Sequence, residues 1–477
     1  MSFRSYDRTV DADGMPGMTL ENIARACEGT YVGSEALYRE CITGIEIDSR
    51  KVSRGCLFVP IKGARVDGHD FIPQVMEQGA MATLTERPLK DAKGPYILVD
   101  STTDALKAIA AFYRRNLDIK VVGITGSVGK TSTKETIASV LATRYRVLKT
   151  KGNYNNEIGV PLTVFRITED DEVAVLEMGI SDFGEMERLT AIAKPDICVI
   201  TNIGQCHLEN LGTRDGILKA KTEIFKGMPD NGVAVLNGDD DKLRTVNQVH
   251  GRKTVFFGID NTEGIHAGNI ISKGLLGTEA TLYNVPCADN VLEFNINISV
   301  PGRHMVYNAM AAAAVGAALG LTSTQIAEGI ASMETIAGRN NIIKTDRFLI
   351  LDDCYNANPV SMKSSIDVIS MAEGRKVCIL GDMFELGKDE KLLHYQVGQY
   401  IAGSNIDLLI TAGKLALNIA DGARDGNASC DIYTFETRDE LMDHLYGLLH
   451  DNDNILIKAS HGMDFAAIVR MLNDSGL

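Results

Sequence analysis

The residues best suited to chemistry lie in one stretch, Val121–Glu135, which reads VVGITGSVGKTSTKE. An apolar run ending at Thr125 predicts a buried strand, and Ser132 to Val140 predicts the helix that follows it. Glycines between the two let backbone N–H groups approach phosphate oxygens, while Lys130 can reach the β- and γ-phosphates and Thr131 can hold Mg²⁺. The stretch therefore predicts a phosphate-binding loop.

This loop departs from the general pattern G-x-x-x-x-G-K-[ST], because Ile124 stands where the first glycine should fall. The spare glycines are Gly123 and Gly126, so we expect a shorter variant of the loop. An ordinary glycine-rich turn is the alternative, but strand, Lys-Thr pair and helix follow in the order that phosphate binding needs. The residues expected to contact a nucleotide here are Thr125, Gly126, Ser127, Val128, Gly129, Lys130, Thr131 and Ser132.

Length and charge limit what surrounds this loop. A chain of 477 residues predicts about three domains, and a net charge of −15 without a Lys/Arg-rich run argues against a nucleic-acid partner. Nine cysteines without a C-x-x-C pair are typical of reduced cytosolic thiols rather than disulfides or a zinc site. No apolar leader or membrane-length apolar run is evident, and we expect a cytoplasmic protein with no membrane span.

Strand-like and helix-like segments alternate along the chain, which predicts an α/β protein. We expect a first domain over residues 1–118, a central domain over 119–336 built on the phosphate loop, and a third domain over 337–477. The central sheet should be mostly parallel with a small antiparallel extension over Gly264 to Val300, and the third domain should be doubly wound and Rossmann-like. Ala309 to Leu321 is expected to be a packed helix.

Polar residues recur where the predicted strands of the central domain end. Glu177 ends one strand, Thr201 and Asn202 follow another, and His207 comes soon after. Ligands gather at the carboxyl ends of parallel strands, and a carboxylate with an imidazole could complete the coordination of Mg²⁺. Lys221 lies on the helix predicted next, where lysines usually face solvent.

The other two domains carry polar clusters of their own. In the third domain they are Asp352–Pro359, Gly381–Met383 and Lys458–His461, all at predicted strand ends; none fits G-x-G-x-x-G, so a dinucleotide is not indicated. In the first domain Arg50 and Lys62 could hold phosphates and Ser49 could contact a base. From charge alone, a solvated surface is the simpler interpretation of that first-domain group.

Nearly the whole chain resembles the Mur ligases, the ATP-dependent amide-forming enzymes of peptidoglycan precursor synthesis. The phosphate loop is shared with other nucleotide-binding proteins, whereas GNYNNEIGVPLT and LDDCYNANPVSM are far more specific. These two segments favour the branch of the family that adds a dipeptide over the branch that adds the third residue. The segments that carry the resemblance span residues 48–71, 125–135, 152–163, 174–179, 206–212, 220–225, 301–312, 337–339 and 351–362.

The resemblance implies three domains, of which the first binds the uridine diphosphate part of the substrate, the central one is a P-loop ATPase and the third is Rossmann-like. It implies a ligase whose substrates are UDP-N-acetylmuramoyl-tripeptide, D-alanyl-D-alanine and ATP. We expect a monomer, although no sequence motif reveals the oligomeric state. ATP would phosphorylate the terminal carboxylate of the tripeptide, the amine of the dipeptide would attack the acyl phosphate, and phosphate would leave. Charge neutralisation and alignment would then supply most of the catalysis.

The resemblance also implies roles for single residues. Lys130, Glu177, His207 and Lys221 would be catalytic, with one Mg²⁺ held by Thr131 and Glu177 and a second by His207 and a carbamate formed on Lys221. Asn308 would lie near the adenine, while Arg339 and Asp353 would close on the nucleotide. The substrate would be bound by Ser49, Arg50, Lys62, Asn155, Asn156, Asn356 and Asn358.

Two positions depart from the family pattern, since Met305 replaces an asparagine and His461 replaces an arginine. Three alternatives remain open: a ligase of the same family that adds a single amino acid, a folylpolyglutamate synthase-like enzyme, or a nucleotide-binding regulator that has lost the chemistry. Intact Lys130, Thr131 and Glu177 argue against the regulator.

Overall fold

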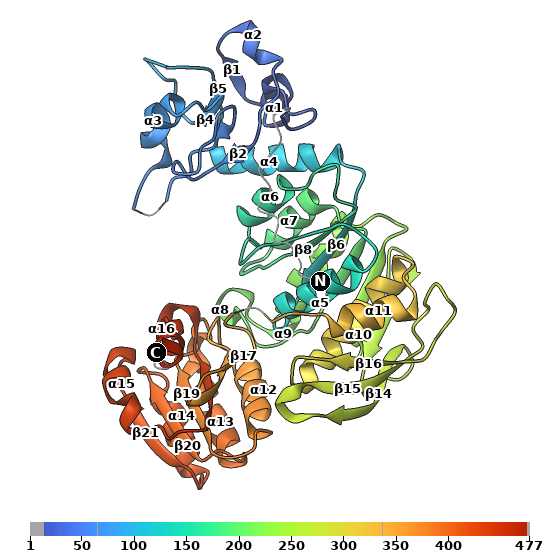
Figure 1. The fold of residues 1–477 in the computed structure, drawn as a ribbon. Coiled ribbons are helices and arrows are strands. Elements are labelled where there is room, and N and C mark those ends of the chain that lie inside the picture. Colours follow the sequence, from blue (N-terminus) through green and yellow to red (C-terminus); the bar gives the residue numbers. More distant parts are fainter. Residues whose placement is uncertain (1–13, 64, 336, 475–477) are drawn as a thin grey trace.

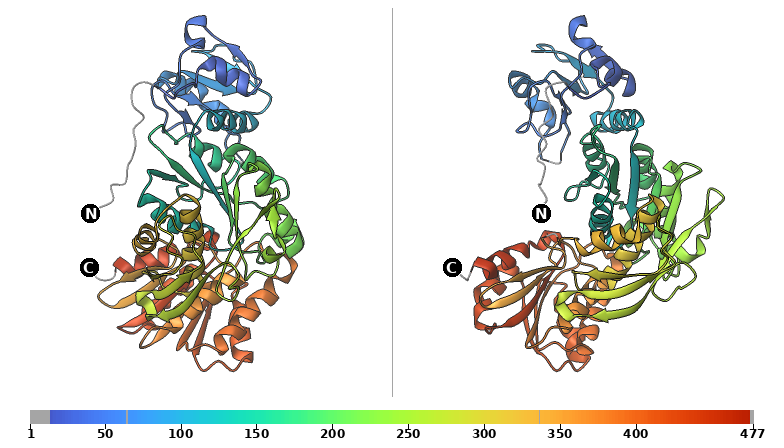
Figure 2. Two further views of the ribbon diagram at one scale, coloured as in Figure 1. Left: turned by 90° about the vertical axis from the view of Figure 1, so that its right-hand side faces the viewer. Right: turned by 45° about the vertical axis from the view of Figure 1, so that its right-hand side comes forward.

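The computed structural model describes residues 14–63, 65–335 and 337–474. Its strands form three large sheets, one within each of the three ranges expected from the sequence, so the α/β class and the three-domain architecture are confirmed. The first and third domains lie at opposite ends of the molecule with the central domain between them (Figure 1, Figure 2). The boundaries at residues 118 and 336 stay predictions.

The first domain is a five-stranded sheet in the order β1-β5-β4-β3-β2 among the described residues. Thr19 accepts a hydrogen bond from the Asn22 amide and caps the first helix, as its position in the sequence indicates. Strand β1, which no apolar run in the sequence predicts, pairs antiparallel with β5, while the other strands run parallel. The elements are α1 (Leu20–Ala26), β1 (Thr30–Val32), α2 (Glu35–Tyr38), β2 (Ile45–Glu46), β3 (Leu57–Phe58), α3 (Ile72–Glu77), β4 (Ala82–Thr85) and β5 (Tyr96–Leu98).

Helix α4 (Thr102–Arg115) joins the first domain to the central one. Its buried Leu106 and Ile109 belong to one apolar cluster that runs from the first domain onto a face of the central sheet. The Tyr113 hydroxyl donates to the Ile167 carbonyl at 2.7 Å, and these contacts fix α4 against the central domain.

The central domain holds a nine-stranded sheet in the order β16-β15-β14-β13-β10-β9-β6-β8-β7. The strands from β7 to β14 in this order are parallel, and β15 and β16 add the antiparallel extension expected from the sequence. The strands are β6 (Lys120–Thr125), β7 (Val147–Lys149), β8 (Val173–Glu177), β9 (Ile197–Ile200), β10 (Val233–Asn237), β13 (Val255–Gly258), β14 (Ile265–Ser272), β15 (Thr278–Tyr283) and β16 (Phe294–Ile298), with β11 (Gln248–Val249) and β12 (Arg252–Lys253) in a separate hairpin.

Helices cover both faces of this sheet (Figure 1). One face packs on α5 (Lys130–Ala142), α10 (Arg303–Ala318) and α11 (Ser323–Ala331). The other packs on α4, α6 (Gly159–Val164), α7 (Glu185–Ala193) and α9 (Arg214–Thr222), with the short α8 (Leu208–Leu211) just before α9. The alanine-rich segment is the packed helix α10, and within the described ranges no helix is both long and apolar enough to cross a membrane.

The third domain is a doubly wound sheet in the order β17-β18-β22-β19-β20-β21, as expected, although the edge strands β17 and β21 were not predicted. Both are short or half-exposed, so their sequences lack the apolar run of a buried strand. The strands are β17 (Asn341–Lys344), β18 (Phe348–Asp352), β19 (Lys376–Gly381), β20 (Leu408–Ala412), β21 (Asp431–Phe435) and β22 (Asp453–Lys458); α12 (Pro359–Ser370), α13 (Glu390–Ala402) and α14 (Leu417–Asp425) cover one face, and α15 (Arg438–His444) and α16 (Ala466–Asp474) the other.

Candidate active site

The phosphate loop connects β6 to α5, and its geometry explains its glycines. Gly126 and Gly129 have φ angles of +150° and +81°, and a Cβ at Gly126 would lie 1.9 Å from the Thr201 hydroxyl. The Lys130 ammonium donates to the Gly126 carbonyl at 2.9 Å, so the lysine folds back over the loop. The helix starts at Lys130, two residues before the predicted start, and its N-terminus faces the loop.

Glu177, at the end of β8, lies beside the start of α5. Its carboxylate accepts hydrogen bonds from the Thr131 hydroxyl at 2.8 Å and from the Asn155 amide at 2.9 Å. The side chain is 2% exposed, and its backbone N–H donates to the Thr150 hydroxyl. The fold thus brings the two residues expected to hold the first Mg²⁺ into contact, with a residue of the expected substrate loop beside them.

The loop after β9, called the supporting loop below, forms hydrogen bonds with the phosphate loop. The Asn202 amide accepts from the Val128 N–H at 2.9 Å and donates to the Val128 carbonyl, while the Gly204 N–H donates to the Ser127 hydroxyl at 2.9 Å. The Thr201 hydroxyl also donates to the Val128 carbonyl at 2.6 Å. Thr201 and Asn202, noted in the sequence at a strand end, therefore shape the loop.

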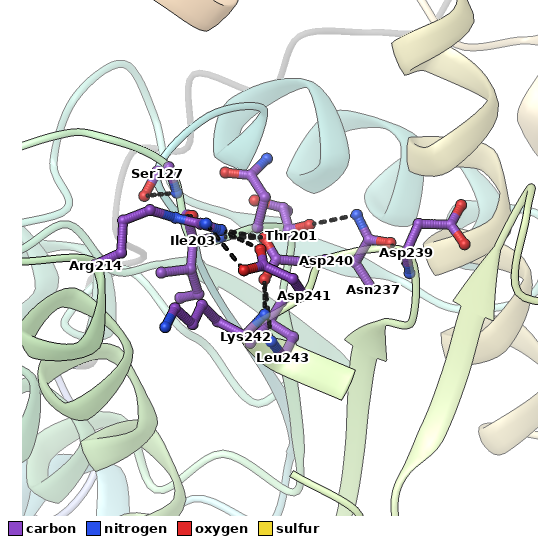
Figure 3. Close-up of polar contacts among 12 residues, drawn as sticks. Ser127, Thr201, Ile203, Arg214, Asn237, Asp239, Asp240, Asp241, Lys242 and Leu243 are labelled. Atoms are coloured by element: carbon purple, nitrogen blue, oxygen red, sulfur yellow. Dashed lines mark hydrogen bonds and ion pairs between the residues drawn. The ribbon is translucent and has the colours of Figure 1, made fainter. Parts of the chain in front are cut away.

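A cluster of acidic residues after β10 fixes this supporting loop in turn (Figure 3). The Asp240 carboxylate accepts from the Ile203 N–H at 2.7 Å, and the Arg214 guanidinium donates to the Ile203 carbonyl at 2.9 Å. Arg214 also forms a two-pronged ion pair with Asp241. Arg214, Asp240 and Asp241 were not among the residues predicted from the sequence, although the acidic run Asp239–Asp241 was a usable signal.

His207 and Lys221 lie close to the phosphate loop. Burial lowers the pKa of His207 to about 4, and the nearby ammonium groups of Lys130 and Lys221 act in the same direction. Lys221 is 1% exposed, contrary to the usual position of a helical lysine, and burial lowers its pKa to about 8. Its ammonium has no hydrogen bond or ion pair with any described residue.

The third domain brings a second polar group to the same place. Asp353, just beyond the end of β18, accepts a hydrogen bond from the Ser365 hydroxyl at 2.6 Å and forms an ion pair with the buried Lys458. The Arg339 guanidinium stacks on the Tyr355 ring at 4.0 Å. Lys458 also donates to the carbonyl of Asn356 at 3.1 Å, which ties the expected substrate loop to the end of β22.

Asn308 on α10 approaches the phosphate loop as well. Its amide oxygen accepts from the Thr133 hydroxyl at 2.9 Å, and its amide nitrogen contacts the Met305 sulfur. The methionine that departs from the family pattern is thus a buried neighbour of Asn308. On the same helix, His304 contacts the amide of Asn340 at 2.7 Å and links α10 to the segment that enters the third domain.

A cavity of about 660 Å³ connects the central and third domains. The predicted residues that line it are Ser127, Val128, Gly129, Lys130, Thr131, Ser132, Asn155, Asn156, Glu177, His207, Asn308, Arg339, Asp353, Asn356 and Asn358. Three predicted residues, Thr125, Gly126 and Lys221, do not line the cavity. The cavity is also lined by residues that were not predicted, among them Tyr307, Asn340, Tyr355 and Glu385.

Ser49, Arg50 and Lys62 lie in the first domain, outside this cavity. Arg50 is exposed and forms an ion pair with Asp48 at 2.8 Å. Lys62 is also exposed, and its backbone forms an isolated antiparallel β-bridge with Asp67. Asp48 and Lys62 follow β2 and β3, whose carboxyl ends lie at one edge of the parallel part of the sheet. Their role in binding the substrate stays a prediction.

Comparison with known proteins agrees with this arrangement. Residues 41–114 match the model of the Mur ligase family catalytic domain, residues 124–316 the Mur ligase middle domain and residues 338–461 the Mur ligase glutamate ligase domain. The chain is 39% identical over 464 residues to the UDP-N-acetylmuramoyl-tripeptide–D-alanyl-D-alanine ligase of Bacillus subtilis, covering 96% of this chain and 99% of the relative.

Solved structures give the same result. A crystal structure of MurF from Acinetobacter baumannii superposes with a TM-score of 0.86 at 30% identity, covering 96% of this chain and 98% of the other. The ADP complex of the MurF ligase from Thermotoga maritima superposes with a TM-score of 0.79 at 32% identity, covering 90% and 97%. Family models, sequence identity and fold agree along nearly the whole length, and we conclude that the chain belongs to the Mur ligase family.

Proposed function

We propose that this chain is the ATP-dependent ligase that joins D-alanyl-D-alanine to UDP-N-acetylmuramoyl-tripeptide in peptidoglycan precursor synthesis. The observation that carries the proposal is the shared cavity, where Lys130 and Glu177 of the central domain face Arg339 and Asp353 of the third. A ligase that activates a carboxylate with ATP must hold two anions side by side, so it needs cations and metal ligands from more than one element. The similarity to the Bacillus subtilis ligase over nearly the full length supports the choice of substrates.

The reaction begins when the terminal carboxylate of the tripeptide attacks the γ-phosphorus of ATP, which forms an acyl phosphate and releases ADP. The amine of D-alanyl-D-alanine then attacks the acyl carbon, and phosphate leaves as the amide forms and the amine loses a proton. Lys130 and the backbone N–H groups of the loop neutralise the phosphates. Asn155, which donates to Glu177 and lines the same cavity, is proposed to contact the acyl end of the tripeptide beside the γ-phosphate.

The residues present fit a divalent cation. Thr131 and Glu177 offer a hydroxyl and a carboxylate in mutual contact, and His207 lines the same cavity. Mg²⁺ bound there would supply charge neutralisation between the phosphates and the tripeptide carboxylate. We assign Thr131 and Glu177 to a first Mg²⁺, and His207 with a carbamate on Lys221 to a second.

Burial of Lys221 supports the carbamate. Burial makes the charged form of Lys221 costly, and the nearby Lys130 ammonium disfavours it further. Addition of CO₂ to the neutral amine with loss of one proton would replace the cation with a carboxylate-like anion. A carbamate at this position would add anionic oxygen ligands, which Mg²⁺ prefers, close to His207.

The substrate must reach from the first domain to the cavity. Ser49, Arg50 and Lys62 are proposed to hold its uridine diphosphate end and Asn156, Asn356 and Asn358 its peptide end. Because these groups lie on three domains, we expect the domains to close around the substrate. Identical small-angle X-ray scattering with and without substrate and a non-hydrolysable ATP analogue would contradict closure.

The decisive experiment measures ADP release from ATP with the UDP-muramoyl tripeptide present and D-alanyl-D-alanine added or withheld. Release that requires both, with one new amide in the product by mass spectrometry, supports the proposal. Release that responds to a single amino acid instead would assign the chain to another branch of the family, and ATP binding without release would favour a regulatory relative. A monomeric state and a cytoplasmic location stay predictions.

A further inference from the structure

One contact at the cavity crosses between domains and belongs to none of the roles assigned above. His207, which precedes α8 in the central domain, has its Nδ1 atom 3.1 Å from a carboxylate oxygen of Glu385 in the third domain. Both residues line the cavity. Glu385 is therefore placed to act on a residue of the proposed metal site without belonging to the same domain.

The loop that carries Glu385 is fixed by two sequence clusters that the proposed function leaves unused. Following β19, the Met383 N–H donates to the buried imidazole of His394 at 2.8 Å. The next N–H, of Phe384, donates to the Ser460 hydroxyl at 2.9 Å. The Ser460 N–H also donates to the Asp382 carbonyl at 3.0 Å, which joins Gly381–Met383 to Lys458–His461. The backbone is thus held up to the residue before Glu385.

The backbone at Glu385 is unusual. Its φ angle of +62° lies in the left-handed region, which costs free energy for a residue with a Cβ. Two residues later Gly387, with a φ of +69°, lies against the backbone of Glu209 in α8. The loop thus turns tightly onto α8 and directs the Glu385 carboxylate toward His207.

The chemistry of metal-binding histidines indicates what this contact could do. A neutral imidazole has one protonated and one unprotonated nitrogen, and only the unprotonated nitrogen can bind a metal ion. Metal-binding histidines usually donate their remaining N–H to a carboxylate or carbonyl, which fixes the tautomer and the ring orientation. The Glu385 carboxylate lies within ion-pair distance of the His207 Nδ1 atom, so a proton on Nδ1 would leave the Nε2 atom for a cation.

We propose that Glu385 is a positioning residue that holds His207 with Nδ1 protonated and Nε2 available to a divalent cation, so that the third domain completes the metal site of the central domain. The inference rests on the proposed function because it assigns His207 to Mg²⁺. Domain closure would then affect the metal site directly, because separating the two domains would remove the Glu385 carboxylate from the His207 imidazole. Glu385 itself touches neither substrate nor metal in this assignment.

The test is a titration of the full-length protein with Mn²⁺ in the presence of ADP, with free Mn²⁺ measured by electron paramagnetic resonance. Glu385→Ala is expected to weaken Mn²⁺ binding about tenfold. Glu385→Gln keeps an oxygen that accepts the Nδ1–H, so it should retain most of the affinity. Asp389→Ala, which removes an exposed carboxylate from the same loop, is the matched control and should bind like the wild type.

Kinetics provide a second measurement. Glu385→Ala should lower kcat and leave KM for D-alanyl-D-alanine unchanged, while its melting temperature stays that of the wild type because the side chain is largely exposed. Unchanged Mn²⁺ affinity in Glu385→Ala, or an equal loss in Asp389→Ala, would overturn the inference. A wild type that fails to ligate the dipeptide while Glu385→Ala still shifts Mn²⁺ binding would overturn the proposed function and support the inference.

Discussion

The Thr131 hydroxyl donates a 2.8 Å hydrogen bond to the Glu177 carboxylate, which joins the first turn of α5 to the end of β8 across 46 positions of the chain. We expect Glu177→Gln to lower kcat roughly 10²- to 10³-fold, because the site loses its buried negative charge. The Mg²⁺ concentration for half-maximal ADP release should also rise. Glu187→Gln, on the exposed face of α7, is the control, and equal Mg²⁺ dependence of both variants would contradict the assignment.

Lys130 is the cation closest to the backbone of the phosphate loop. Lys130→Ala should abolish ligation, with a loss of roughly 10³-fold or more, since it removes the neutralisation of the transferred phosphate. Lys253→Ala removes an exposed lysine from β12 and should leave the rate unchanged. Near-normal turnover of Lys130→Ala in the ADP-release assay would exclude the loop as the phosphate site.

The carbamate can be observed directly. Protein equilibrated with ¹³C-bicarbonate should show a carbamate resonance that Lys221→Ala lacks and Lys219→Ala, with an exposed lysine on the same helix, retains. Lys221→Ala should be nearly inactive and partly rescued by short carboxylic acids, which can occupy the space of the lost anion. Full activity without rescue would show that Lys221 has only a structural role.

Arg214 is expected to act through the supporting loop rather than on substrate, because it bonds Ile203 and Asp241 and does not line the cavity. Arg214→Gln should raise KM for MgATP about tenfold and leave KM for the dipeptide constant. The reason is that the supporting loop, which bonds Ser127 and Val128, loses one of the two side chains that bond its Ile203 backbone. Arg244→Gln, on the exposed side of the same region, is the control. A lowered melting temperature with unchanged KM would mean that Arg214 only stabilises the fold.

His394 gives the third domain a predictable pH dependence. Burial lowers its pKa below the ordinary 6.5, its Nδ1 donates to the Glu390 carbonyl, and its Nε2 accepts from Met383. Protonation therefore favours the unfolded state, so this contribution to stability is complete above pH 6.5 and decreases as the pH falls below it.

Hydrogen exchange of residues 376–402 should consequently accelerate between pH 6.5 and 5.5, after correction for the intrinsic rate. His394→Gln, which keeps an acceptor but does not titrate, should lose this dependence. The exposed His444→Gln should keep it. Equal pH dependence in all three proteins would show that His394 is not the group responsible.

The sequence alone determined the class of fold, the phosphate loop and most of the cavity. Strongly apolar strands such as β6, β8 and β19 carry their own signal. Polar residues at the carboxyl ends of parallel strands, such as Glu177 in the central sheet and Asp353 after β18 in the third domain, are expected at the ligand-binding edge of each sheet. A run of apolar residues likewise predicted the alanine-rich helix α10. The edge strands β1, β17 and β21 were missed because their side chains are only partly buried.

Only the tertiary structure decided what depends on contacts between distant segments. A helical pattern gives Lys221 no reason to be buried, because its burial comes from the packing of α9 against one face of the central sheet. Arg214, Asp240 and Asp241 look like ordinary surface charges until the fold brings them to Ile203. Glu385 contacts His207 only because the central and third domains lie side by side. The two residues are 178 positions apart (385 − 207), and no local pattern in either segment predicts a contact over that separation.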